Sequence, residues 1–213
     1  MKKIVLSLLA FSFIGLYSCS NEPTTTTKEK VETTTKTSRH YSLLPGKAGV
    51  RWTAFKFTER AGVTGTFDNI EAKEMVEGES LSDALKGLSY KIPVSSINSN
   101  NEDRDSKLTT FFFGVMNETP AITGTFGEFN GNDQFGTCNI IINMNGLSQS
   151  VDFEYKVNEN NLSFLSMIDM NNWEGEFALN SINKKCEDLH KGKDGKSVIW
   201  PEVKLEMVIP FSK

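Results

Sequence analysis

The feature that most constrains the fold is a hydrophobic alternation with a period of two, which recurs along most of the chain after residue 40. In its cleanest stretch, residues 151–157 (VDFEYKV), apolar and charged side chains alternate strictly. Successive side chains of a β-strand point to opposite faces of a sheet, so this pattern predicts strands with one buried face. Strands are predicted near residues 50–57, 63–67, 88–94, 122–126, 138–144, 151–157, 162–169 and 203–211.

Turn-forming residues separate these stretches. The strongest hairpin signal is Asn145-Gly146, and the segments 130–133 (NGND) and 158–161 (NENN) also favour turns. One apolar and one polar face on every strand is typical of an antiparallel sheet closed around a single interior. Eight strands suffice for a barrel that is either filled by its own side chains or holds one small ligand. The predicted fold class is therefore all-β, an eight-stranded antiparallel barrel.

Two segments depart from the alternation and predict helices. Residues 102–113 are charged and then rich in Phe, which we interpret as one short helix. Residues 173–190 place Ala178, Ile182, Cys186 and Leu189 at spacings of four, four and three, which is a single helical stripe. This segment predicts a longer helix.

The N-terminus has the pattern of an export signal. Lys2 and Lys3 precede the apolar run Ile4 to Leu16, whose 13 residues are too few to span a bilayer. The run ends in Leu-Tyr-Ser-Cys, which resembles the bacterial lipoprotein box, so residues 1–18 are predicted to be a lipoprotein signal peptide and Cys19 to be acylated. The alternative is ordinary cleavage near Ser18, with Cys19 an incidental thiol.

The segment that follows predicts a tether between this anchor and the folded domain. Eight of the 20 residues from Ser20 to Arg39 are Thr, and Val31 is the one apolar residue. Such a composition cannot offset chain entropy by burial, so we expect residues 19–39 to be disordered. Residues 40–213 then form the barrel domain, anchored by acyl chains in the bacterial envelope, facing the periplasm or on the surface of the outer membrane.

Composition and missing motifs exclude several functions. A formal net charge of −4 argues against nucleic-acid binding through a basic face. Three Cys and two His are too few for a Cys/His zinc cluster, and no nucleotide-binding, metalloprotease or hydrolase motif occurs. We therefore expect neither a metal, nor a resident cofactor, nor an enzyme.

One stretch of sequence resembles a known family. Residues 96–122 contain, in order, Ser96-Ile97, Arg104-Asp105, Leu108, Phe112-Phe113 and Pro120-Ala121-Ile122. This order resembles the YceI-like, or polyisoprenoid-binding, family, and Gly65-Thr66-Phe67 resembles its Gly-x-Phe element. Lys107 and Phe111 stand where the family commonly has His and an acidic residue. The resemblance implies a lipocalin-like barrel whose elongated apolar cavity binds a long-chain, often quinone-like isoprenoid, without catalysis.

With this resemblance, the inward-facing residues become ligand candidates, although a well-packed barrel core would use the same residues. The candidates for the apolar cavity are Trp52, Phe67, Ile92, Phe113, Ile122, Phe126, Ile142, Phe153 and Phe164. Asp105 is expected near a helix start, where the helix dipole favours a carboxylate. We expect Arg104 to fix that helix to the barrel rim through bidentate bonds; the alternative is contact with a ligand head.

Two further Cys residues allow a disulfide. An oxidising envelope permits a bond between Cys138 and Cys186, which would pin the longer helix to the barrel. The competing interpretation is two buried free thiols that pack as small hydrophobes.

Two functional hypotheses follow. The first is an envelope-tethered protein that holds a long-chain isoprenoid or similar amphiphile in its barrel. The second is a barrel with a filled core that acts on a partner protein through its loops.

Overall fold

The computed structural model describes residues 40–212. The expected signal peptide, the acylated Cys19 and the tether lie outside the described residues. The strands are β1 (Tyr41–Leu43), β2 (Gly49–Lys56), β3 (Ala61–Phe67), β4 (Val76–Gly78), β5 (Ser89–Pro93), β6 (Ile97–Asn98), β7 (Ala121–Gly131), β8 (Phe135–Met144), β9 (Leu147–Asn158), β10 (Asn161–Asp169) and β11 (Ile199–Ser212). The α-helices are α1 (Leu81–Leu85), α2 (Glu102–Phe111) and α3 (Glu176–Lys185), with 3-10 turns η1 (Pro45–Lys47), η2 (Val94–Ser96), η3 (Phe113–Val115), η4 (Met170–Trp173) and η5 (Glu187–His190).

The strands form an antiparallel, near-closed barrel of nine strands, one more than predicted. Their order is β5-β7-β8-β9-β10-β11-β2-β3-β6. The extra strand, β6, continues the chain from β5 after the single turn η2, so one bent segment pairs with β7 at its start and with β3 at its end. Two backbone hydrogen bonds between Glu71 and Lys91, of 2.8 and 2.9 Å, join the segment after β3 to β5. The same bent segment thereby closes the sheet from both sides.

The alternation predicted the remaining strands correctly, and the hairpin at Asn145-Gly146 is confirmed. This turn joins β8 to β9, with Met144 opposite Leu147. Asn145 and Gly146 have φ values of 52° and 71°, the left-handed region that a tight two-residue hairpin requires and that these residue types tolerate. The Asn145 side chain also donates from Nδ2 to the carbonyl oxygen of Trp173 at 2.7 Å, which ties the hairpin to η4.

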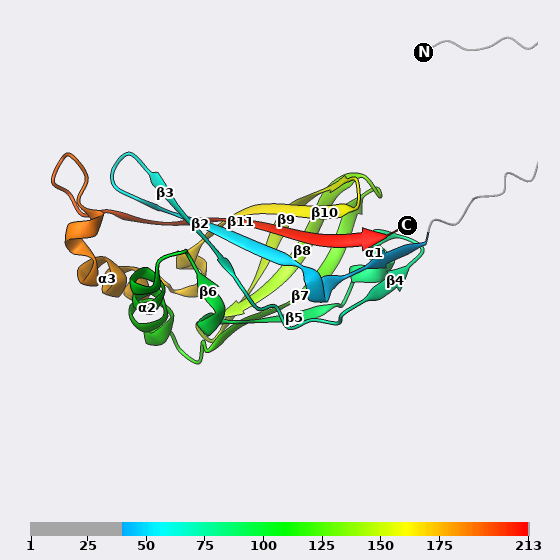
Figure 1. Cartoon of the computed structure of the whole chain (residues 1–213), viewed down its shortest axis with the longest axis horizontal. Helices are drawn as coiled ribbons and strands as arrows, with labels where there is room; N and C mark the ends of the chain where they lie inside the picture. The colour runs from blue at the N-terminus through cyan, green and yellow to red at the C-terminus, as the bar shows by residue number, and fades with distance from the viewer. Residues whose placement is uncertain (1–39, 213) are drawn as a thin grey trace, which may run out of the picture. The chain divides into compact units, whose positions relative to one another are not determined.

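The two ends of the barrel are covered differently, as Figure 1 shows. At one end β1, β4 and α1 lie together, where β1 pairs with both β11 and β4. At the other end α2 and α3 lie beside each other across the barrel. None of the helices within residues 40–212 is both long and apolar enough to cross a membrane.

The interior is filled at the end that β1 and α1 cover. The side chains that are at most 1% exposed there are Tyr41, Leu43, Leu81, Leu85, Cys138 and Leu162. Tyr41 packs against Phe211 with ring centroids 5.8 Å apart. This end of the barrel is a packed core, at the density usual for protein interiors.

The predicted longer helix is shorter than expected. Continuous α-helix ends at Lys185, and residues 187–190 form the 3-10 turn η5. Ala178, Ile182 and Cys186 are buried, as the stripe predicted, but Leu189 is 57% exposed. The prediction for Leu189 was wrong because a 3-10 turn changes the angular spacing of side chains.

The structure also corrects the disulfide hypothesis. Cys138, on β8, and Cys186, at the end of α3, are buried free thiols, so the disulfide that the sequence allowed is not formed. Burial raises the pKa of the Cys138 thiol to about 12. Both residues pack as small hydrophobes, which was the competing interpretation.

Candidate functional site

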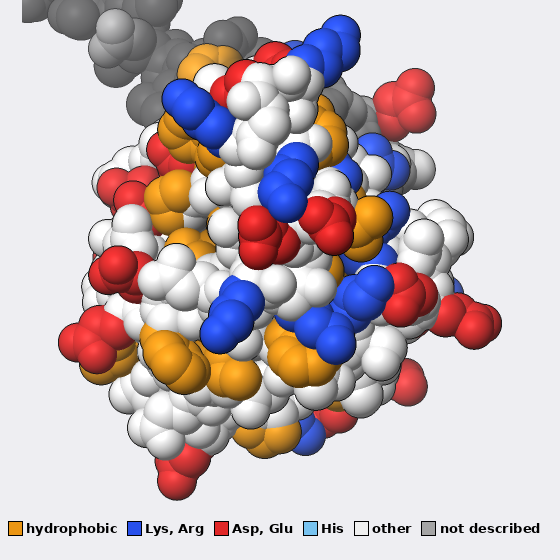
Figure 2. Space-filling view, turned by 90° about the vertical axis from the view of Figure 1, so that its left-hand side faces the viewer, with side chains coloured by type: hydrophobic (Ala, Val, Ile, Leu, Met, Phe, Trp, Pro, Cys, Tyr) orange, Lys and Arg blue, Asp and Glu red, His pale blue; other side chains and the backbone are white. Residues whose placement is uncertain are grey.

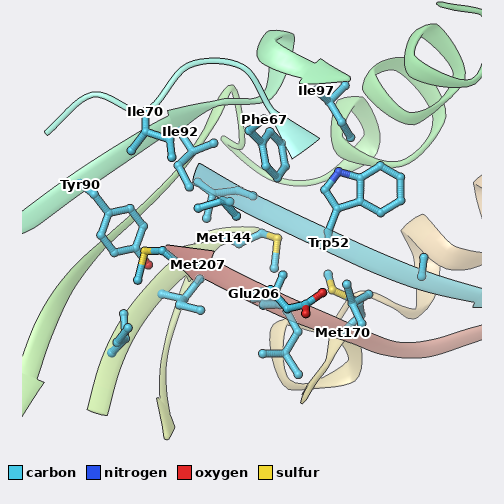
Figure 3. A pocket seen from close by; sticks show the side chains of 18 of the residues that line it. Trp52, Phe67, Ile70, Tyr90, Ile92, Ile97, Met144, Met170, Glu206 and Met207 are labelled. Carbon is cyan, nitrogen blue, oxygen red and sulfur yellow. The ribbon is translucent and has the colours of Figure 1, made fainter. Parts of the chain in front are cut away.

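The candidate site is an apolar cavity of about 160 Å³ inside the barrel, and its lining extends from α2 and α3 to Pro45 and Ala48, just after β1. Figure 3 shows side chains from several strands around it, among them Trp52 of β2, Phe67 of β3, Ile92 of β5 and Met207 of β11. The cavity exists because these strands curve around an interior that their own side chains do not fill. An apolar space of this kind is unfavourable for water and favourable for a hydrocarbon group.

The structure places most of the sequence-predicted ligand candidates at this cavity. Those in its lining are Trp52, Phe67, Ile92, Phe113, Ile122, Phe126, Ile142 and Phe153. Phe164 does not line it, although its side chain points inward and is only 2% exposed. Phe164 instead belongs to the packed half of the barrel.

An aromatic layer forms the boundary between the hollow and the packed halves. Phe126 lines the cavity, and its ring centroid lies 5.5 Å from that of Phe164, which lies outside the lining. Behind Phe126, the rings of Phe129, Tyr155 and Phe164 contact one another with centroids 5.5–6.4 Å apart. Phe126 is therefore the lining residue through which the cavity meets this aromatic cluster.

The opposite end of the cavity is covered by helices. Leu108 of α2, with Leu179 and Ile182 of α3, contributes to the lining. Phe112 and Phe113 join them from the end of α2, with their rings edge to face at 4.9 Å. Both Phe residues thus stand at the helical end of the barrel.

Two glycines in strand interiors shape the wall. An added Cβ on Gly65 would lie 2.3 Å from the indole Cζ2 of Trp52, its cross-strand neighbour. On Gly124 it would lie 2.4 Å from the hydroxyl oxygen of Tyr90, again a cross-strand neighbour. Each aromatic ring thus covers a glycine instead of projecting into the hollow. Our sequence reasoning missed this arrangement, although glycine within a strand is a recognised sign of close approach.

The polar groups in the lining are all occupied. Trp52 donates from Nε1 to the carbonyl oxygen of Thr66 at 3.3 Å, and Trp200 donates to that of Phe57 at 2.7 Å. The Tyr90 hydroxyl makes a long bond of 3.5 Å to the carbonyl oxygen of Ile141, and burial raises its pKa above the ordinary value. None of these groups is free to bind a ligand head.

One carboxylate, Glu206, belongs to the lining. Glu206 lies between Leu205 and Met207 on β11, and its cross-strand partner Arg51 is exposed. Because side chains alternate along a strand, the side chain of Glu206 points to the outside of the barrel. Its carboxylate lies 3.0 Å from the Lys204 ammonium. Within residues 40–212, therefore, the cavity presents no unpaired charge to a guest.

Asp105 and Asn101 make hydrogen bonds that hold the start of α2 in place. The Asp105 carboxylate accepts hydrogen bonds from the backbone N–H and the hydroxyl of Ser99, at 3.0 and 2.6 Å. Asn101 caps the helix by accepting from the N–H of Arg104 at 2.9 Å. The bidentate bonds expected of Arg104 are not formed, and neither Arg104 nor Asp105 lines the cavity.

Charges elsewhere on the helical end are mixed. Figure 2 shows basic and acidic side chains intermingled there with apolar ones. Several of the lysines are paired locally, such as Lys191 with Asp188 at 2.9 Å. Within the described part of the chain, no group of three His, Cys, Asp or Glu side chains is arranged to hold a metal ion.

A near-closed β-barrel around an apolar cavity defines the class of proteins that hold a small hydrophobic molecule in a barrel. Residues 41–211 match the family model of the YceI-like domain, and the chain belongs to this family. The family is one of binding proteins and is generally non-catalytic. No curated protein matches the sequence.

Solved structures share the fold at low sequence identity. A polyisoprenoid binding domain from Saccharophagus degradans, implicated in plant cell wall breakdown, matches with a TM-score of 0.57 at 15% identity, covering 81% of this chain and 97% of its own. BcnA from Burkholderia cenocepacia matches with a TM-score of 0.55 at 13% identity, covering 80% and 99%. The YceI protein of Campylobacter jejuni matches with a TM-score of 0.51 at 17% identity, covering 74% and 90%.

Proposed function

We propose that this protein binds the hydrocarbon tail of an isoprenoid, or of a similar amphiphile, in the cavity of its barrel. The observation that carries the proposal is the cavity itself, which is apolar and free of unpaired charge among residues 40–212. The similarity to a polyisoprenoid binding domain supports an isoprenoid as the ligand. The polar head would remain at the surface, because the described lining offers it no unoccupied partner.

Burial of the tail in the apolar lining supplies the affinity. Each buried methylene contributes about 0.8 kcal/mol, against an association cost of about 4 kcal/mol or more. Binding therefore strengthens with the length of tail that the lining covers.

We propose further that the protein works in the bacterial envelope, tethered there through an acylated Cys19. The positive N-terminal residues, the apolar run and the Cys at its end support this assignment. With such an anchor the barrel would exchange its ligand close to a membrane, either to carry it or to store it. Intact-mass analysis of the protein from its native membrane tests this part, since acylation adds the mass of the fatty chains and a Cys19→Ser variant would lack it.

Ligand binding is tested by organic extraction and native mass spectrometry of the protein purified from its own envelope. A stoichiometric apolar molecule supports the proposal. A clean mass without ligand, together with no uptake of added isoprenoid alcohol, would instead favour the interaction module with a filled core.

A matched pair of variants connects the bound molecule to the cavity. Ala54 and Arg51 lie on the same strand, β2, but Ala54 lines the cavity and Arg51 is exposed on the other face. Ala54→Phe should weaken uptake because the added ring occupies part of the cavity. Arg51→Phe adds the same ring outside and should leave uptake unchanged.

A further inference from the structure

We propose that the ligand enters and leaves the cavity through the side of the barrel, between residues 68–75 and β5, and that the bridge between Glu71 and Lys91 holds this entrance closed. We call the line of contact between residues 68–75 and β5 the seam. The inference rests on the proposed function and adds the entry route and the residues that control it.

The first step is the weak pairing on one edge of β5. This strand ends the barrel sheet and pairs along its whole length with β7. On its other edge one isolated bridge joins it to the segment after β3, with hydrogen bonds of 2.8 and 2.9 Å between the backbones of Glu71 and Lys91. Within the described chain, no backbone hydrogen bond joins residues 72–75 to β5. The wall can therefore open at the seam when two backbone hydrogen bonds break.

The second step is the inner face of the seam. An antiparallel bridge between Glu71 and Lys91 places Ile70 opposite Ile92. Both of these side chains line the cavity, where Figure 3 shows them near each other, and Ala72 lines it as well. Glu71 and Lys91 are exposed, and their carboxylate and ammonium groups lie 3.1 Å apart. The seam thus has an apolar inner face and is held on the outside by one exposed ion pair.

The third step is a groove on the outer surface beside the seam. Its lining comes from residues 71–77 and 83–89. Ala72 and Leu88 line both this groove and the cavity, so the two spaces lie on either side of the same layer of chain. Met75, also in the groove, is 53% exposed and offers an apolar contact to a tail outside the barrel. Opening of the seam joins the groove to the cavity.

Both ends of the described barrel, in contrast, are closed by buried side chains. Phe112 and Phe113 are each 8% exposed at the helical end, where Ile182 is 3% exposed. Tyr41 and Leu43 are fully buried at the other end. Passage through either end would bring packed apolar side chains into water, which the hydrophobic effect opposes. The side chains at the seam already face an open space.

The test closes the seam with a disulfide, Glu71→Cys with Lys91→Cys, in the full-length protein. Hydrogen-bonded antiparallel pairs have Cα atoms about 5.5 Å apart, a separation that a disulfide spans. Stopped-flow fluorescence follows the uptake of cis-parinaric acid, a polyene fatty acid that fluoresces in apolar surroundings, and its release to phosphatidylcholine vesicles. We expect oxidation to lower both rates about tenfold or more, and reduction to restore them. The dissociation constant should stay nearly the same, because neither residue lines the cavity.

A matched disulfide joins β5 to its other neighbour. Ser89 and Thr125 lie opposite each other on β5 and β7, with their hydroxyl oxygens 3.2 Å apart. Oxidation of Ser89→Cys with Thr125→Cys should change the two rates by less than about twofold, since these strands stay paired while the seam opens. Glu71→Lys is an independent variant that places two ammonium groups opposite each other across the seam. It should raise both rates about two- to fivefold.

The outcomes separate the two proposals. If the unmodified protein takes up neither cis-parinaric acid nor an added isoprenoid alcohol, the proposed function fails and the route fails with it. If the oxidised seam variant exchanges its ligand as fast as the reduced one, the route is wrong and the proposed function stands. The route is also wrong if the matched disulfide slows exchange equally, or if oxidation of the seam changes the dissociation constant but not the two rates. Where the seam disulfide does not form, unchanged rates in Glu71→Lys overturn the route.

Discussion

The pairing of Trp52 with Gly65 makes a sharp prediction about what keeps the wall of the cavity flat. The indole ring covers Gly65 so closely that a Cβ there would lie 2.3 Å from Cζ2 and 2.6 Å from Cε2. Ordinary contact begins near 3.4 Å, so Gly65→Ala requires a shift of about 1 Å. The indole can move only toward the hollow, since Trp52 lines the cavity.

The cost of this substitution follows from the geometry. Overpacking of this kind costs typically 1–3 kcal/mol, and the carbonyl oxygen of Asn98, at 2.8 Å from the added Cβ, contributes part of it. For a domain of this size, each kcal/mol lowers the melting temperature by about 2–4 °C. We therefore expect Gly65→Ala to lower it by roughly 2–12 °C and to weaken ligand uptake as the indole enters the cavity.

A double-mutant cycle measured by urea denaturation isolates the ring contact. Trp52→Leu removes both indole carbons that the new Cβ would meet, so Gly65→Ala should cost less in that background. We expect a coupling energy of about 1 kcal/mol between the two substitutions. The matched control is Gly49→Ala on β2, where an added Cβ meets nothing within 4 Å and stability should change little or rise slightly. Equal costs of Gly65→Ala in both backgrounds would refute the reasoning.

Three other predictions concern buried polar groups. Burial lowers the pKa of His190 to about 4, from an ordinary 6.5, so the unfolded chain binds the proton more tightly. The resulting stability is complete above pH 6.5 and is lost as pH falls toward 4; because His190 is partly exposed and solvent screens its charge, the loss is about 1–2 kcal/mol. Urea denaturation at pH 7 and 4 should show this loss in the unmodified protein, and a smaller loss in His190→Gln. Trp173→Phe removes the Nε1 bond of 3.1 Å to the Ile142 carbonyl oxygen and should cost about 2–4 kcal/mol of unfolding free energy, since the indole is fully buried. Cys138 and Cys186 should resist a thiol reagent at pH 8 in the folded protein and both react in denaturant; fast labelling of the folded protein would contradict their burial.

The eight longer strands could be predicted from the sequence because each buries one face. A strand with one buried face has apolar residues at every second position. The short elements could not. β6 has two residues and β1 and β4 have three each, too few for a periodic pattern to emerge. These short strands form only because they pair with strands distant in sequence, as Ile97 of β6 pairs with Phe67 of β3. With β6 added, the eight predicted strands become a near-closed barrel of nine.

The limits of the site prediction have a different cause. Alternation tells which face of a strand a residue occupies, but not how far along the barrel it lies. Phe126 and Phe164 are both inward, yet one touches the cavity and the other lies behind it. Position along the axis depends on strand register and on what covers each end, and the sequence of one strand contains neither. Gly65 and Gly124 were the available signal, since each lies on an inward position within a strand.

The packed and the hollow halves of the barrel depend on each other. Lining side chains of an empty space lose their dispersion partners, so a cavity of about 160 Å³ lowers the stability of the domain that contains it. The fully buried set around Tyr41, Leu43, Leu81 and Leu85 offsets that loss without entering the cavity. A domain built this way can remain folded while its cavity is empty, and any molecule that bound only the folded state would add stability. The filled end thus allows the rest of the interior to stay open.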